Sequence, residues 1–170
     1  MAASKNKPAL PKDAAAGKRF AIVASRYHEE LTQELHSGAL EALKALGAKE
    51  EDIDTFWVPG AFEIPAAARA VSQHRDVHAI LCLGVILKGE TPHNKYIARE
   101  VARGIAQIHA ATGIPATFGV LTPDTLDQAK ARAGGSRGNK GAEAAQAAVA
   151  MIHLLDEIKS GSRKTKSVGF

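Results

Sequence analysis

The sequence predicts an α/β fold in which helices cover both faces of one parallel sheet. Four short apolar segments alternate with longer segments whose apolar residues recur at helical spacing. Strands that alternate with helices of about 10 to 20 residues pair in parallel, because each connection crosses one face of the sheet and returns to the same end. With 170 residues, 45% of them hydrophobic, the chain can form one folded core. These observations predict a three-layer α/β/α sandwich.

The first half of the chain predicts two strands, each followed by a helix. Residues 19–25 are short, apolar and followed by polar residues, as in a buried strand. Apolar residues recur at helical spacing from 28 to 46, and Gly47 is a suitable stop. Residues 53–58 predict a second strand. The alanine-rich stretch 64–73 predicts a helix whose small side chains allow close packing on a sheet.

The second half repeats this order and adds one helix. Residues 78–87, HAILCLGVIL, are apolar almost throughout and are expected at the centre of the sheet. A helix begins near Pro92, and a fourth strand covers 115–121. A short helix over 124–133 and a glycine-rich loop precede a long helix over 139–159. With four parallel strands, the sandwich is expected to be flavodoxin-like.

The net charge of +4 is carried by the two ends of the chain. Residues 1–17 sum to +2 and residues 161–170 to +3, so the rest is close to neutral. Both ends lack the periodicity of helices or strands. We therefore expect a flexible N-terminal arm over 1–17, one domain over 18–159 and a disordered basic tail over 160–170. The alternative is an assembly protein whose basic ends bind nucleic acid, but a short charged tail is usually only solvated, and we expect no nucleic-acid partner.

The cysteine and histidine content of the chain limits which disulfides and metal sites can form. The single Cys82 excludes an intrachain disulfide and lies in an apolar run, as a small core residue does. None of the 7 histidines has metal-ligand spacing with a cysteine or acidic partner, so we expect no metal site. No apolar stretch approaches the roughly 20 residues that span a bilayer. The N-terminus lacks the apolar segment of a secretory signal, so we expect a cytoplasmic protein without a membrane partner.

The loops at the carboxyl ends of the strands hold the candidate site, because open parallel sheets bind ligands there. Tyr27 could stack on a flat ring or pack across its loop. Glu63 either favours a helix N-terminus through the dipole or accepts hydrogen bonds from ligand hydroxyls. Thr91 is placed to cap the next helix, whose N-terminus suits a phosphate. His93, one residue inside that helix, is either a surface residue or a group that transfers protons. Arg132 either binds phosphate or forms a surface ion pair.

Four motifs near these loops occur together and in a fixed order. They are WVPGAFEIP (57–65), LGVILKGETPH (83–93), FGVLT (118–122) and RAGGSRGNKGAEAA (132–145). With them the chain resembles the lumazine synthase (6,7-dimethyl-8-ribityllumazine synthase) family over about residues 19–158. The resemblance implies a transferase that needs no cofactor and catalyses the penultimate step of riboflavin biosynthesis. It would condense 5-amino-6-(D-ribitylamino)uracil with 3,4-dihydroxy-2-butanone 4-phosphate, to give 6,7-dimethyl-8-ribityllumazine, phosphate and water.

The resemblance also implies a role for each site residue. His93 would be the catalytic proton shuttle, and Tyr27 would stack on the pyrimidine. Glu63 would accept hydrogen bonds from ribityl hydroxyls, and Arg132 would neutralise the phosphate. The residues implied to bind the ribitylaminouracil are Tyr27, Ala61, Phe62, Glu63, Val85, Ile86, Leu87, Phe118 and Lys140, and those implied to bind the phosphate are Glu90, Thr91 and Arg132.

The assembly of relatives implies partners for this chain. The site would lie at a subunit interface of a pentamer, with Phe118, Arg132 and Lys140 supplied by the neighbouring chain. The short loop 134–138 is compatible with an icosahedral 60-mer shell. Beside the small-molecule substrates, the resemblance raises riboflavin synthase as a candidate partner. The alternative is a flavin- or lumazine-binding module without catalysis, in which His93 and Arg132 would not matter.

The chain departs from the family pattern at three places. Residues 85–89 read Val-Ile-Leu-Lys-Gly where Thr-Val-Ile-Arg-Gly is common. Pro92 stands where threonine or alanine is frequent, and Ser136 where many members have lysine. None of these changes removes a residue to which the resemblance gives a role.

Overall fold

A four-stranded parallel sheet forms the middle layer of the chain in the computed structural model, which describes residues 10–161. The strands lie in the order β2-β1-β3-β4, so β1 and β3 are central and β2 and β4 form the edges. In chain order they are β1 (Phe20–Ser25), β2 (Ile53–Val58), β3 (Ala79–Val85) and β4 (Ala116–Leu121). The predicted four-stranded parallel sheet is confirmed, although β3 ends two residues before the predicted strand does.

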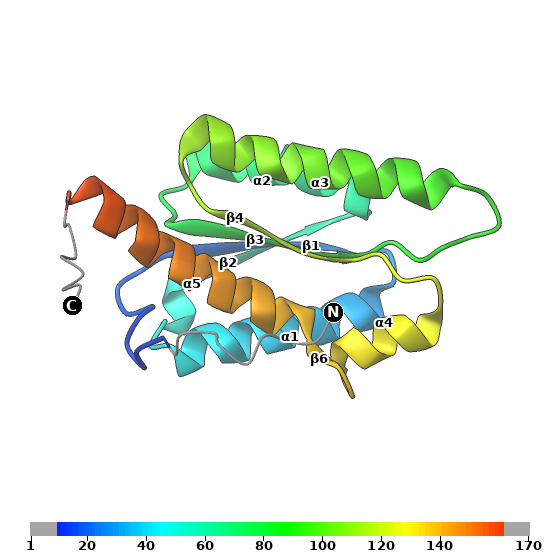
Figure 1. Cartoon of the computed structure of the whole chain (residues 1–170), viewed down its shortest axis with the longest axis horizontal. Coiled ribbons are helices and arrows are strands. Elements are labelled where there is room, and N and C mark those ends of the chain that lie inside the picture. Colours follow the sequence, from blue (N-terminus) through cyan, green and yellow to red (C-terminus); the bar gives the residue numbers. More distant parts are fainter. Residues whose placement is uncertain (1–9, 162–170) are drawn as a thin grey trace, which may run out of the picture.

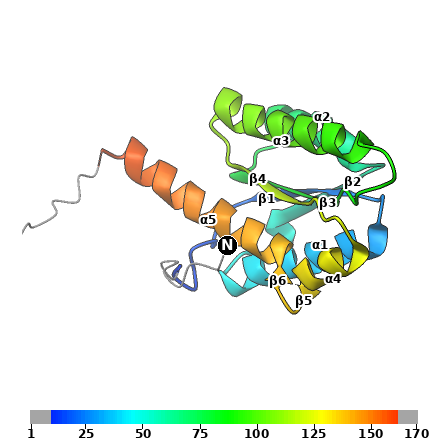
Figure 2. The ribbon, with the colours of Figure 1, turned by 45° about the vertical axis from the view of Figure 1, so that its right-hand side comes forward.

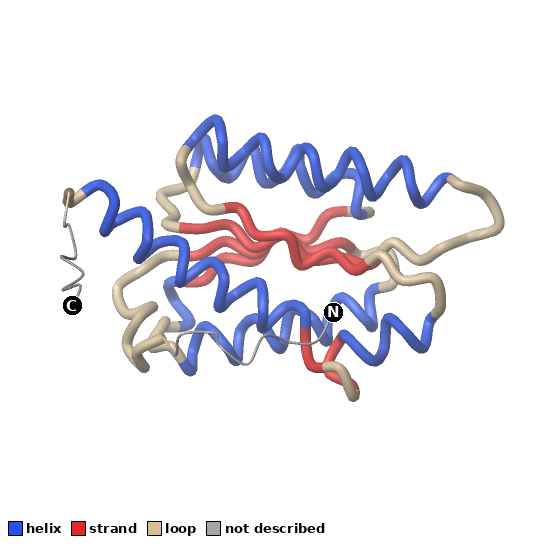
Figure 3. Tube along the Cα trace, in the orientation of Figure 1, coloured by secondary structure: helices blue, strands red, loops and turns tan. Residues whose placement is uncertain are grey.

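Helices cover both faces of this sheet, as Figure 1 shows and the red middle layer of Figure 3 makes plain. On one face lie α2 (Ile64–His74) and α3 (His93–Thr112). On the other lie α1 (Glu29–Ala45), α4 (Leu126–Arg132) and α5 (Lys140–Lys159). The chain is therefore a three-layer, flavodoxin-like sandwich, as the alternation of apolar patterns predicts.

The core divides into two clusters, one on each face of the sheet. Alternate residues of β1 and β3 point to opposite faces, so Ile22 and Leu81 join the cluster under α1 and α5. Val23 and Cys82 join the cluster under α2 and α3. Burial raises the pKa of the Cys82 thiol to about 12. The prediction that Cys82 is a small core residue is confirmed.

Residues 10–17 pack against the body, whereas the sequence predicts a flexible arm over residues 1–17. Ala14 and Ala15 are buried, and the Ala15 N–H donates to Leu46 O at 2.7 Å. His153 Nε2 donates to Ala14 O at 2.7 Å. Single buried alanines leave no periodic pattern, which is why the sequence does not indicate this contact. The rest of the predicted arm and residues 162–170 of the predicted tail lie outside the described residues.

The glycine-rich segment predicted as a loop contains a small hairpin. Here β5 (Ala133–Gly135) pairs antiparallel with β6 (Gly138–Asn139), as seen beside α4 in Figure 2. Gly134 and Gly138 have φ angles of 109° and 80°, in the left-handed region that glycine adopts without strain. Strands this short carry no apolar alternation, so composition predicts only a turn. Two short 3₁₀ helices, η1 (Glu50–Asp52) and η2 (Ala61–Glu63), are likewise not predicted.

Gly141 allows the backbones of α1 and α5 to lie close together. A Cβ added to Gly141 of α5 would lie 2.7 Å from the carbonyl carbon of Leu35 in α1, with the carbonyl oxygen closer still. Asn139 joins the same two helices. Its Oδ1 accepts from the N–H groups of Gly141 at 2.8 Å and Ala142 at 3.1 Å, and its Nδ2 donates to Glu34 O at 2.7 Å. The Asn139 carboxamide thus caps the N-terminus of α5 and joins α5 to α1 by a hydrogen bond.

His36 belongs to α1 and lies half-buried against the edge strand β2. Its Nε2 is 2.9 Å from Thr55 Oγ1, and its ring centroid is 5.5 Å from that of Trp57. Burial lowers the pKa of His36 from its ordinary value of 6.5. When folded, this imidazole binds fewer protons than in the unfolded chain. Its contribution to stability is therefore complete above pH 6.5 and is lost as the pH falls through the lowered pKa.

Replacing His36 with asparagine is expected to reduce the loss of stability on acidification, because one group that resists protonation is removed. Urea unfolding at a series of pH values below neutrality, followed by Trp57 fluorescence, measures this, since Trp57 is the only tryptophan. The exposed His74 provides the control. In His74→Asn, the free energy of unfolding is expected to fall with decreasing pH as steeply as in the wild type. Equal slopes for wild type and His36→Asn would contradict the prediction.

Candidate active site

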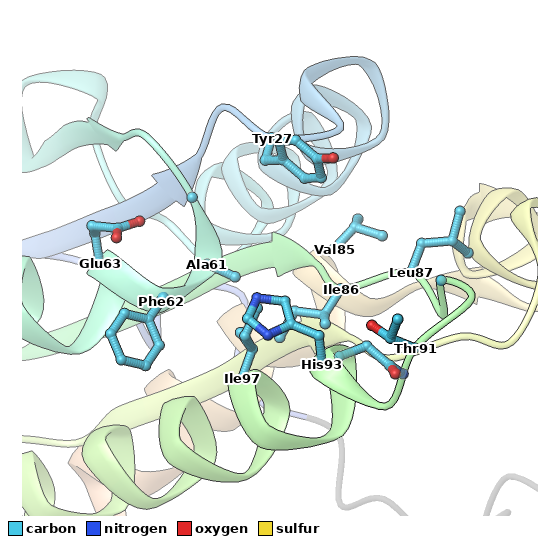
Figure 4. Close-up of a pocket in the computed structure, with 13 residues that line it drawn as sticks. Tyr27, Ala61, Phe62, Glu63, Val85, Ile86, Leu87, Thr91, His93 and Ile97 are labelled. Atoms are coloured by element: carbon cyan, nitrogen blue, oxygen red, sulfur yellow. The ribbon is translucent and has the colours of Figure 1, made fainter.

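A cavity of about 430 Å³ opens at the carboxyl edge of the sheet, where open parallel sheets bind ligands. Figure 4 shows side chains from several separate loops turned toward this space. The loop after β1, the turn after β2, the end of β3 and the first turn of α3 all contribute. The lining residues are Tyr27, Gly60, Ala61, Phe62, Glu63, Val85, Ile86, Leu87, Gly89, Thr91, His93, Asn94 and Ile97.

The cavity brings together most of the residues that the sequence singles out. Of the predicted site residues, Tyr27, Ala61, Phe62, Glu63, Val85, Ile86, Leu87, Thr91 and His93 line it. Glu90, Phe118, Arg132 and Lys140 do not. Among the lining residues that sequence analysis did not select, Asn94 carries a polar side chain. Only its position beside His93 could have indicated it.

Tyr27 stands over the cavity on a loop fixed by backbone hydrogen bonds. The Tyr27 N–H donates to Pro59 O at 3.1 Å, which ties the end of β1 to the turn after β2. His28 adopts left-handed angles, with φ 59° and ψ 47°, and its ring packs edge-on against Tyr27 at a centroid distance of 4.8 Å. The Tyr27 side chain is 68% exposed, so much of the ring remains free to meet a flat ligand.

The turn after β2 presents Phe62 and Glu63 to the cavity. Glu63 lies at the N-cap position of α2, yet its carboxylate makes no capping hydrogen bond. Its Oε2 would be 3.0 Å from a Cβ added to Gly60, so a glycine leaves room for this carboxylate above the backbone. The carboxylate forms no ion pair among residues 10–161 and is available to accept hydrogen bonds from a ligand.

The start of α3 differs from the prediction. The sequence predicts Thr91 as the helix cap and Pro92 as the first helical residue, but α3 begins at His93 and Pro92 occupies the cap position. No side chain caps this helix. The capping role predicted for Thr91 is therefore wrong, and His93 is the first residue of the helix rather than one residue inside it. The Thr91 hydroxyl is not used in capping, so it remains available in the cavity lining.

The floor of the cavity is held by the ends of the two neighbouring strands. Beyond β3, the Ile86 N–H donates to Leu121 O at 2.8 Å and the Lys88 N–H to Pro123 O at 3.1 Å. A Cβ on Gly84 would lie 2.7 Å from Ser25 Oγ, so the glycine leaves room for the Ser25 side chain at the end of β1. Val85 and Ile86 are buried, and they give the cavity a rigid apolar base.

Arg132 and Lys140 lie together elsewhere on the same chain. They line a second cavity of about 270 Å³ beside the carboxyl end of β4. Arg132 Nη1 donates to Gln128 O at 3.1 Å and forms no ion pair among the described residues, while Lys140 Nζ pairs with Glu143 Oε2 at 2.7 Å. Phe118, 41% exposed, belongs to the edge strand β4. A single chain thus presents these three side chains apart from the first cavity.

Within residues 10–161, histidine, cysteine and acidic side chains form no group of three or more that could hold a metal ion. No helix in this range is long and apolar enough to cross a membrane.

A comparison with protein families matches nearly the whole body of the chain. The family described as 6,7-dimethyl-8-ribityllumazine synthase matches residues 17–156. This range includes the complete sheet and every residue that lines the first cavity. It also includes Phe118, Arg132 and Lys140. The chain therefore belongs to the 6,7-dimethyl-8-ribityllumazine synthase family, a family of transferases in riboflavin biosynthesis.

Proposed function

We propose that the protein condenses 5-amino-6-(D-ribitylamino)uracil with 3,4-dihydroxy-2-butanone 4-phosphate to form 6,7-dimethyl-8-ribityllumazine, phosphate and water. The family match over residues 17–156 carries the proposal. The cavity supports it, because its volume of about 430 Å³ suits small molecules and its lining combines apolar walls with a few polar groups. The reaction needs no cofactor.

The ribitylaminouracil would occupy the space between Tyr27 and the β3 end. The pyrimidine ring would stack on Tyr27, whose exposed ring lies opposite the apolar base. The Glu63 carboxylate would accept hydrogen bonds from ribityl hydroxyls. Ala61, Phe62 and the backbone of residues 85–87 would enclose the rest of the molecule.

The phosphate of the second substrate would bind where α3 begins. The first N–H groups of a helix have no partner within it, and the helix dipole favours an anion there. Thr91 would add its hydroxyl, and Glu90 its backbone N–H. Arg132 would supply the positive charge that these neutral donors lack.

Holding both substrates in one cavity would provide much of the rate enhancement. The 5-amino group attacks the ketone and a water leaves to form an imine. Loss of a proton from C3 and of phosphate from C4 then gives an enol, which tautomerises to a carbonyl at C3. The ribitylamino nitrogen attacks this new carbonyl, and a second water leaves as the ring closes. Each step moves protons between nitrogen, oxygen and carbon. His93, at the cavity and on the first turn of α3, would carry them.

The site would be completed by a neighbouring subunit. In one chain Arg132 and Lys140 line a different cavity from Thr91 and His93, which supports their service to the site of another copy. Phe118, half-exposed on the sheet edge, would close the pyrimidine pocket of that copy. We accordingly propose a homo-oligomer, either a pentamer or a larger shell of pentamers.

The direct test mixes both substrates with purified, assembled protein and follows the fluorescence of the lumazine. We expect product formation that depends on both substrates. Absence of product from well-folded protein would overturn the proposal. Tight binding of riboflavin without turnover would instead favour a binding module of the same fold.

Replacing Arg132 with alanine is expected to raise the KM for the butanone phosphate by roughly 10- to 100-fold, because a charge-assisted hydrogen bond to phosphate is lost. The KM for the ribitylaminouracil should change little. Steady-state kinetics with each substrate varied in turn measure both values. Lys130, an exposed cation on the same helix, provides the control, and Lys130→Ala should leave both KM values unchanged.

Co-expressing His93→Ala and Arg132→Ala chains tests whether the site is shared. In a randomly mixed oligomer, about one quarter of the interfaces would pair an intact His93 with an intact Arg132 from the neighbour. Activity at low butanone phosphate should therefore exceed that of either variant alone. If mixing restores no activity, His93 and Arg132 serve the same site within one chain, and the shared site is wrong.

A further inference from the structure

Asn94 lines the cavity directly after His93, and its side-chain oxygen is buried without a hydrogen-bond partner among the described residues. Buried carboxamide oxygens nearly always have a donor, because otherwise their lost hydration is not replaced. Only four side-chain atoms in the described part of the chain share this condition, those of Ser25, Thr32, Asn94 and Thr117. Of these residues, Asn94 alone lines the cavity.

We propose that Asn94 Oδ1 accepts a hydrogen bond from a hydroxyl or amino group of a bound substrate and helps to select that substrate. The inference rests on the proposed function and adds a specificity-determining residue to it. An acceptor without a donor is satisfied by an O–H or N–H group, whereas a fully ionised phosphate has no proton to give. Asn94 Oδ1 would therefore contact a hydroxyl or amino group of a substrate and not its phosphate oxygens.

A comparison with Asn139 shows that Asn94 is not serving its helix. Both asparagines lie where a long helix begins, Asn139 as the cap of α5 and Asn94 as the second residue of α3. Asn139 Oδ1 accepts from two backbone N–H groups, at 2.8 and 3.1 Å, and its Nδ2 donates to α1. Asn94 Oδ1 accepts from none within the described residues. Its position in a cavity wall then indicates a ligand as the missing donor.

Leucine at position 94 tests the proposal, since it keeps the approximate size of asparagine and removes both polar groups. Asn94→Leu is expected to raise the KM of one substrate by roughly 3- to 30-fold, the effect of one lost hydrogen bond. Asn94→Asp keeps the acceptor and should recover part of the loss. Each KM is measured with the other substrate saturating, so the substrate whose KM rises identifies the donor group.

Gln107→Leu provides the matched control, because it removes a carboxamide from the same helix at an exposed position away from the cavity. Its KM values should equal those of the wild type. Asn94→Leu should also unfold at the same or a higher temperature than the wild type without substrates, because an unpaired buried oxygen is gone. A folded variant with a raised KM would thus support a role in binding.

Two outcomes separate this inference from the proposed function. If the wild type forms lumazine and Asn94→Leu keeps both KM values, Asn94 is not a substrate contact and the inference alone is overturned. It is equally overturned if Asn94→Leu lowers the solution mass of the assembly with KM unchanged, since a subunit contact would then satisfy the oxygen. Failure of the wild type to form product would overturn the proposed function and this inference with it.

Discussion

Replacing His93 with alanine is expected to lower kcat by roughly 10²- to 10⁴-fold, the range typical of losing a positioned acid–base group. His93 is exposed at the first turn of α3 and belongs to the cavity wall, so its removal should leave the fold intact. The KM values should change far less than kcat. Single-turnover formation of the lumazine under saturation with both substrates measures the chemical step directly.

The exposed His74, at the end of α2, provides the control for this experiment. His74→Ala should retain wild-type kcat, because it lies outside the cavity lining. A loss of less than about 10-fold in His93→Ala would show that the substrates supply their own proton transfers. The enzyme would then act chiefly by bringing them together.

Replacing Gly141 with alanine is expected to destabilise the protein by about 3 kcal/mol or more, because the added methyl group meets backbone rather than a movable side chain. The Leu35 carbonyl belongs to α1 and cannot turn aside within its helix. The two helices would have to separate, which would also stretch the hydrogen bond from Asn139 Nδ2 to Glu34 O that joins them. Urea unfolding of the variant, followed by Trp57 fluorescence, measures the free energy of unfolding.

Gly89 provides a control glycine for the same measurement. A Cβ at Gly89 would meet no atom within 4 Å, so Gly89→Ala should change the free energy of unfolding by no more than about 0.5 kcal/mol. Nearly equal stability of Gly141→Ala and the wild type would show that α1 and α5 can move apart at little cost. The close glycine contact would then not matter for the fold.

Periodic apolar residues explain why the layers of this protein could be predicted. The runs that become β1 and β3 are buried on both faces, and the α1 residues at helical spacing face one core cluster. Open parallel sheets bind ligands at the carboxyl ends of their strands, and this tendency then locates the loops that form the cavity. Neither inference requires any knowledge of how side chains pack in detail.

Features set by single contacts were not predictable in this way. The turn at residues 10–17 packs through small alanines, and the hairpin after α4 depends on two left-handed glycines. The helix start at His93 depends on how Pro92 turns, which residue preference alone does not fix. Asn94 can be recognised as a candidate site residue only when the burial of its side-chain oxygen is known.

The bond from Asn139 to Glu34 crosses 105 positions of sequence and has a consequence for synthesis of the chain. Helix α5 covers an apolar face of α1 that includes Leu35, Ala39 and Leu43. During synthesis α1 leaves the ribosome early, whereas α5 leaves it last. Strands β1 and β3 emerge earlier and pack on the same helix, but until about residue 152 has emerged the part of this nascent face that α5 buries stays exposed and can attract chaperones or other unfinished chains. Ribosomes that stall before that point would release aggregation-prone fragments.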